Sequence, residues 1–169
     1  SMAKDLGFKV AKIRDKSLSS SSTSISDVQS WHLNILENEY GYHPDVITHA
    51  EITYPFRPPN LIDELISTLT LTDADTVLPA KVEFSWAWKN IDDDNSIRLD
   101  EGDVPRKYKK SLLLGSHGLG CVSYSEVLRR NSLVGEKVHL LPIKNQLSFI
   151  EVRTKEECEY YFSKISFNK

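Results

Sequence analysis

Segments rich in β-branched residues alternate along this chain with segments whose apolar residues recur at helical spacing, as Leu61, Leu65 and Leu69 do. The expected strands cover residues 8–13, 45–53, 76–82, 137–143 and 146–152, and the expected helices cover residues 26–39, 60–69, 123–131 and 154–165. This alternation predicts an α/β fold, arranged as a three-layer sandwich around a mixed, mainly parallel sheet.

The composition limits the number of domains and the classes of partner. With 169 residues the chain fits one domain, which we expect to cover residues 3–169. A net charge of −3 favours neither nucleic acid nor a membrane as a partner. Cys121 and Cys158 form no CxxC pair, which favours the reducing cytoplasm, and we expect both to be small buried groups. The longest aliphatic run, residues 112–114, is far shorter than the roughly 20 residues of a transmembrane helix.

The stretch from Ala50 to Ile66 predicts a strand, a proline-stiffened loop and a helix in direct succession. The loop carries Tyr54 and Arg57, and Asn60 is placed to cap the helix. In an open parallel sheet, ligands bind in the crevice beyond the carboxyl ends of the strands, where an arginine can meet an anion. The loop is therefore predicted to form half of a nucleotide or sugar-nucleotide site.

Four polar or glycine-rich segments have both a functional and a purely structural interpretation. The serine-rich residues 17–26 form either a solvated linker or a loop that wraps a polyanion. Asp73 and Asp75 resemble the DxD of metal-dependent sugar transferases, but a turn is favoured because they precede a strand. The basic run 105–110 is either a phosphate-facing patch or a solvated loop. Residues 115–120 lack the end of a phosphate loop, so their glycines predict close backbone approach or a strand crossing.

Large aromatic residues alternate with smaller ones at the start of the segment 83–110. Phe84, Trp86 and Trp88 lead to an acidic turn at residues 92–95, which predicts a β-hairpin with an aromatic face. This insertion is either a dimerisation surface, which would make the protein a homodimer, or an internal core face.

Five short motifs follow one another along the chain in an order that indicates a known family. They are Thr23–Val28, Glu51–Arg57, Thr72–Val77, His117–Gly118 and Glu151–Arg153. They resemble the S-S-x-x-D-V, Q-P-T-S-P-L-R, S-D-A-D-S-V, N-G and D-I-D motifs of the acylneuraminate cytidylyltransferases. These CMP-sugar synthetases have the Rossmann-like nucleotide-diphospho-sugar transferase fold. The resemblance covers residues 3–165, and it is carried by the order and spacing of the motifs.

The resemblance implies a nucleotidyltransferase that moves CMP from CTP to an acidic sugar such as sialic acid, releasing pyrophosphate with the help of Mg²⁺. It places the substrate at five residues, Thr53, Tyr54, Arg57, Arg106 and His117. Glu151 would be the remaining metal ligand. No catalytic residue is assigned.

The sequence departs from the family pattern at two places. The family's first strand and the glycine-, arginine- and lysine-bearing loop that holds the CTP triphosphate have no counterpart here. Arg153 stands at the second D-I-D aspartate and cannot ligate Mg²⁺. We therefore expect no turnover by this chain alone, unless another polypeptide supplies the missing segment. The alternative is a non-catalytic module that binds a nucleotide or sugar or assembles subunits.

Overall fold

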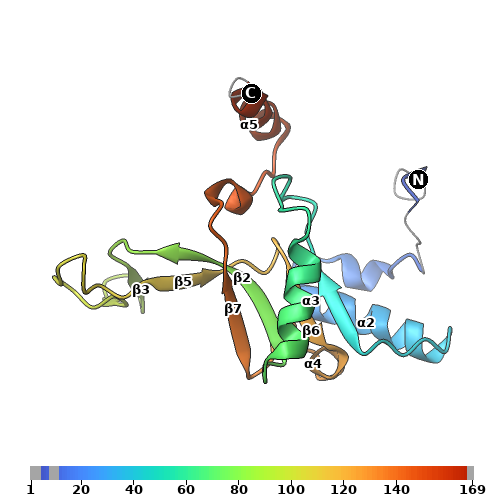
Figure 1. Ribbon diagram of the computed structural model, residues 1–169. Helices are drawn as coiled ribbons and strands as arrows, with labels where there is room; N and C mark the ends of the chain where they lie inside the picture. The colour runs from blue at the N-terminus through green and yellow to red at the C-terminus, as the bar shows by residue number, and fades with distance from the viewer. Residues whose placement is uncertain (1–4, 8–11, 167–169) are drawn as a thin grey trace.

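The computed structural model describes residues 5–7 and 12–166 and confirms the α/β class (Figure 1). The helices are η1 (Lys16–Ser19), α2 (Ile25–Asn38), α3 (Leu61–Leu71), α4 (Ser125–Arg129), η2 (Gln146–Phe149) and α5 (Lys155–Ser166). The strands are β1 (Val46–His49), β2 (Thr76–Glu83), β3 (Trp88–Asn90), β4 (Ser96–Arg98), β5 (Leu112–Gly115), β6 (Cys121–Tyr124) and β7 (Val138–Pro142). None of the described helices is both long and apolar enough to cross a membrane.

The main sheet is mixed, as predicted, but its pairing is mostly antiparallel. β6 lies between β1 and β2 and runs antiparallel to both, and β5 also pairs antiparallel with β2. Only β7 pairs parallel with β2 among the described strands. The prediction of a mainly parallel sheet is therefore wrong for the pairing. The reason is that the chain returns along β2 after a hairpin instead of crossing over through a helix.

β5 and β6 form one interrupted strand. β5 pairs with the second half of β2, where Gly115 lies opposite Ala80. β6 pairs with its first residues, where Ser123 lies opposite Thr76. Residues 116–120 form the interruption and leave the ladder. Because the chain returns to the same strand β2 after them, the described residues show no strand crossing at these glycines.

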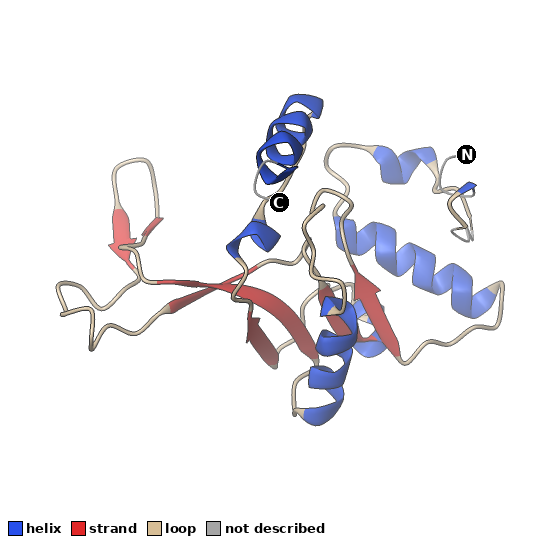
Figure 2. Ribbon diagram, turned by 45° about the horizontal axis from the view of Figure 1, so that its top comes forward, coloured by secondary structure: helices blue, strands red, loops and turns tan. Residues whose placement is uncertain are grey.

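Helices lie on both faces of the sheet, so the predicted three-layer arrangement is present (Figure 2). Val122 points to one face and packs in the cluster that α3 supplies. Its neighbours Cys121 and Ser123 point to the other face, where they line a small cavity together with Gln29 of α2 and Leu128 of α4. The period of two along a strand produces this division.

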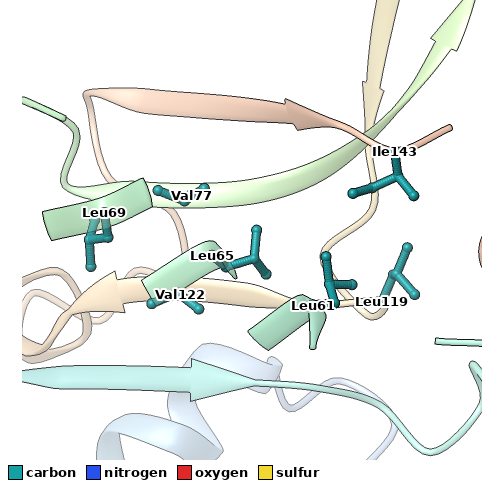
Figure 3. Close-up of a cluster of buried hydrophobic side chains, with 7 residues drawn as sticks. All are labelled: Leu61, Leu65, Leu69, Val77, Leu119, Val122 and Ile143. Carbon is teal, nitrogen blue, oxygen red and sulfur yellow. The ribbon is translucent and has the colours of Figure 1, made fainter. Parts of the chain in front are cut away.

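The core lies between α3 and the sheet (Figure 3). Leu61, Leu65 and Leu69 recur at every fourth position of α3, and all three are buried. They meet Val77 of β2 and Val122 of β6, which are also fully buried. This stripe is the apolar face that the sequence predicted for the helix.

Side-chain caps explain two differences from the predicted elements, one in where a helix begins and one in the type of an element. The helix expected from residue 26 begins at Ile25, because Ser24 accepts a hydrogen bond from the backbone of Asp27 and forms the capping box. Residues 146–152 do not form the expected strand. Asn145 accepts a hydrogen bond from Leu147 N at 3.1 Å and starts the 3-10 helix η2.

The two ends of the chain depart most from the predictions. Most of the strand expected at 8–13 lies outside the described residues. The spacing of Cys158, Tyr161, Phe162 and Ile165 predicts that the final helix buries these four side chains. In the structure α5 lies apart from the sheet (Figure 1), and the Phe162 side chain is 48% exposed. Phe56 provides the ring contacts to Tyr161 and Phe162. Cys158 is only half-buried, and the side chain of Ile165 lies outside the described part.

We predict that Leu65→Ala lowers the free energy of unfolding by about 2–5 kcal/mol, because it leaves a cavity in a fully buried site. Urea denaturation followed by circular dichroism measures this change. Leu71→Ala on the same helix is the matched control, since that side chain is 85% exposed. Equal losses for the two variants would contradict the assignment of the core.

Candidate functional site

Three loops that are far apart in the sequence meet beyond the carboxyl end of β1. They are residues 50–57, 116–119 and 151–153. The register pairs His49, the last residue of β1, with Cys121, the first residue of β6, so the residues that precede β6 lie beside those that follow β1. Glu51 N donates to Gly118 O at 2.8 Å, and Val152 N donates to Thr53 O at 2.8 Å.

Arg57 ties the first two loops together. Its Nε donates to Leu119 O at 2.6 Å, and its Nη2 donates to Glu51 O at 2.6 Å and to Gly118 O at 3.2 Å. Partial burial lowers the pKa of Arg57 from its ordinary value. The arginine that was predicted to bind a ligand therefore donates hydrogen bonds to backbone carbonyl groups. These bonds connect the two loops of the site.

Gly118 permits the close approach of the two loops. A Cβ atom on this residue would lie 2.6 Å from Tyr54 Cε2 and 2.8 Å from Glu51 Cδ. Any other residue would therefore displace these side chains. The close backbone approach predicted for the glycine-rich segment is confirmed here.

His49, Glu51 and His117 form a compact cluster at this meeting point. One ligand atom of each residue lies within 4.8 Å of the other two. His49 Nε2 is 3.6 Å from Glu51 Oε1, and the rings of His49 and His117 stack with their centroids 4.3 Å apart. Both histidine Nε2 atoms are buried, and neither has a hydrogen-bond partner among the described residues.

The imidazole groups of the cluster differ in their surroundings. The side-chain amide of Gln29 contacts His49 Nδ1. If the amide nitrogen donates, the His49 proton sits on Nε2. If the amide is turned so that its oxygen accepts, the proton sits on Nδ1 and Nε2 keeps a lone pair. Burial lowers the pKa of His117, and the charge of His49 lowers it further, whereas the Glu51 carboxylate opposes both effects. The lowered pKa favours the neutral form of the His117 imidazole.

A depression of about 440 Å³ adjoins the cluster. His49 and Glu51 line it together with Arg14, Arg153 and residues at the amino-terminal end of α2. A helix amino terminus carries a partial positive charge and attracts anions. With the two arginines, this end of the depression is suited to an anionic group.

The predicted metal residue Glu151 forms an ion pair with Arg153 at 2.7 Å. The carboxylate raises the pKa of the guanidinium through a hydrogen bond and through its charge. A fixed positive charge at this distance opposes a divalent cation. Glu151 and Arg153 therefore fit a Mg²⁺ ion poorly.

The predicted residue Arg106 lies in a different depression. It lines a space of about 440 Å³ at the base of the hairpin, together with Trp86 and Lys109. The basic run around it is partly neutralised, since Lys109 Nζ lies 3.1 Å from Asp100 Oδ2 and Lys110 Nζ lies 3.4 Å from Glu101 Oε1. The structure thus brings together Thr53, Tyr54, Arg57, His117 and Glu151 but separates Arg106 from them.

The DxD-like residues have structural contacts, as the turn interpretation predicted. Asp75 accepts hydrogen bonds from the backbone of Glu136 and Lys137 at 3.0 and 3.2 Å. Asp73 forms an ion pair with Lys137 Nζ at 2.7 Å.

Burial raises the pKa of the Cys121 thiol to about 12, so Cys121 is an inert buried group, as expected.

His49, Gln29 and Arg14 were missed by the reasoning from sequence. His49 is the last residue of β1, and its contact with Gln29 depends on how α2 packs against β1. One signal was available, because Ile47 and His49 share a strand face with period two. A polar residue at the end of that face points toward a neighbouring helix.

The sequence matches no family model and has no significant match among curated proteins. The resemblance to the cytidylyltransferases therefore stays a prediction.

We predict that Arg57→Gln lowers the free energy of unfolding by about 1.5–3 kcal/mol, because it removes charge-assisted bonds to three carbonyl groups. Arg106→Gln should leave the free energy of unfolding almost unchanged, because Arg106 is exposed and lies outside the site. Urea denaturation compares the two variants. Unchanged stability in Arg57→Gln would show that its guanidinium is free to serve a ligand.

Proposed function

We propose that this chain is a cytidylyltransferase-like domain that binds a nucleotide or an acidic sugar through its anionic group. In this proposal the ligand is CTP, CMP or a sialic-acid-like sugar, and the domain by itself does not transfer CMP. In this proposal the fold is that of the nucleotide-diphospho-sugar transferases. The observed mixed sheet with helices is consistent with that fold.

The convergence of three motif segments carries the proposal. The resemblance implies one ligand site for the segments that begin at Glu51, His117 and Glu151. These segments meet through hydrogen bonds between main-chain groups and through the Arg57 guanidinium. Side chains that converge at the end of a strand are typical of ligand sites in α/β proteins.

The charges around the depression favour an anion as the ligand. Arg14 and Arg153 line it near the amino-terminal end of α2. Arg153 is paired with Glu151, but a guanidinium has five N–H donors, so donors remain for a phosphate or carboxylate. The same ion pair supports binding without Mg²⁺-dependent transfer, because it occupies the position at which the resemblance expects the metal.

Isothermal titration of the chain with CTP, CMP and sialic acid tests the proposal. We predict saturable binding of at least one of them and no pyrophosphate release from CTP and sialic acid in the presence of Mg²⁺. Arg153→Gln should weaken this binding by about tenfold, the loss expected for one charge-assisted hydrogen bond.

Arg130→Gln is the control for charge, because Arg130 is an exposed arginine at the end of α4. Pyrophosphate release would overturn the non-catalytic assignment. Failure of all three compounds to bind would overturn the nucleotide- and sugar-binding proposal.

Subunit assembly through the β3–β4 hairpin is a second candidate function. Trp86 and Trp88 are 59% and 51% exposed, and the hairpin projects away from the main sheet (Figure 2). Arg98 lies over both indole rings, 4.6 and 5.3 Å from their centroids. Exposed aromatic residues beside an arginine are typical of interface hot spots.

We predict that sedimentation velocity shows a dimer for the wild-type chain and a shift toward monomer for Trp86→Ala and Trp88→Ala, because each variant removes an aromatic contact. Tyr108→Ala is the control, since Tyr108 is exposed but lies outside β3 and β4. A monomeric wild-type chain, or variants that sediment like the wild type, would remove the hairpin as the interface.

A further inference from the structure

We propose that His49, Glu51 and His117 bind one divalent transition-metal ion of the zinc type. This site is distinct from the Glu151 position at which the resemblance expects Mg²⁺. The proposal does not depend on a nucleotide or sugar ligand, because it rests on the side chains of the cluster alone.

The spacing of the three side chains is close to that of a metal site. Their ligand atoms lie within 4.8 Å of one another, and His49 Nε2 and Glu51 Oε1 are 3.6 Å apart. Bonds of 2.0–2.1 Å in a tetrahedral site separate the ligand atoms by about 3.4 Å. The rings of His49 and His117 are stacked with 27° between their planes. Binding of one ion therefore requires the imidazole rings to turn until their in-plane lone pairs meet at the ion.

The unpaired ring nitrogens are the observation that points to a ligand. His49 Nε2 and His117 Nε2 are both buried and lack hydrogen-bond partners among the described residues. A buried polar atom without a partner costs free energy of folding, about 1–3 kcal/mol. The Glu51 carboxylate lies too far from His49 for a hydrogen bond, so it does not satisfy that nitrogen. A cation between the three groups would satisfy both nitrogens and the carboxylate together.

Neighbouring groups hold two of the proposed ligands in place. Gln29 contacts His49 Nδ1, and with its oxygen turned to that nitrogen it selects the tautomer whose Nε2 can bind a metal. Thr53 Oγ1 donates to Glu51 Oε2 at 3.3 Å and leaves Oε1 facing His49. A Cβ atom on residue 118 would lie 2.8 Å from Glu51 Cδ, so the position of this carboxylate requires the glycine. Partners of this kind orient the ligands of known metal sites.

The donor set selects the class of metal. Imidazole groups favour zinc, copper, iron and nickel, whereas Mg²⁺ favours oxygen ligands and keeps its water. Two histidines and one glutamate form the three-ligand set of open zinc sites, in which the fourth position stays accessible. His49 and Glu51 line the depression of about 440 Å³, so an exchangeable ligand has a route to the metal.

Titration calorimetry of the full chain, stripped of metal with a chelator, tests the site. ZnCl₂ should bind with one ion per chain, and MgCl₂ should not compete. Bound Co²⁺ should show the visible absorption of a four-coordinate ion. Each of His49→Gln, His117→Gln and Glu51→Gln should weaken zinc binding by at least about tenfold, since loss of an outer-shell partner already costs that much.

His43→Gln is the matched control, because His43 is an exposed histidine outside the cluster. Zinc should raise the melting temperature of the wild type and His43→Gln but not that of the cluster variants. Circular dichroism establishes that each variant is folded, and Glu51→Gln keeps the size of the side chain. The proposal is overturned by absent one-to-one binding, by unchanged affinity in a folded cluster variant, or by equal weakening in His43→Gln.

Discussion

The antiparallel pairing of β1 with β6 is the constraint on which the candidate site depends. It sets His49 opposite Cys121, and therefore places Glu51 beside the loop that carries His117. Arg57 then fixes both loops by donating to carbonyl groups on each side. Because these bonds join backbone to a guanidinium, the geometry of the loops does not depend on a bound ligand. Such prior organisation reduces the ordering cost of binding.

Two kinds of chemistry meet in one depression. Arg14, Arg153 and a helix amino terminus line it, and these groups suit an anion. Glu51 and His49 also line it, and with His117 they form the cluster proposed to bind a cation. In the predicted resemblance to the cytidylyltransferases, Glu51 corresponds to a neutral glutamine and His117 to an asparagine. Carboxylate and imidazole groups are metal ligands of the proposed type, whereas amide groups are not.

The parts of the fold that depend on residues close together in the sequence were predicted correctly. The apolar stripe of α3 and the strand β2 lie where the sequence placed them. The prediction for residues 146–152 was wrong because alternating residues also suit a 3-10 turn once Asn145 caps it. The strand expected at residues 45–53 ends at His49, so residues 50–53 belong to the loop. Sequence alone does not reveal which carbonyl groups the Arg57 guanidinium reaches, because two of those groups belong to a loop about 60 residues further along the chain.

The sequence by itself determined the α/β class, the core face of α3 and the presence of an aromatic hairpin, because helix periodicity, caps and turns act over a few residues. Only the tertiary structure decided the strand order, the antiparallel return of β5 and β6, and the meeting of His49 with His117. Pairing between distant strands depends on register and on the packing of whole layers. A cluster assembled from a strand and two loops therefore becomes visible only when that register is known.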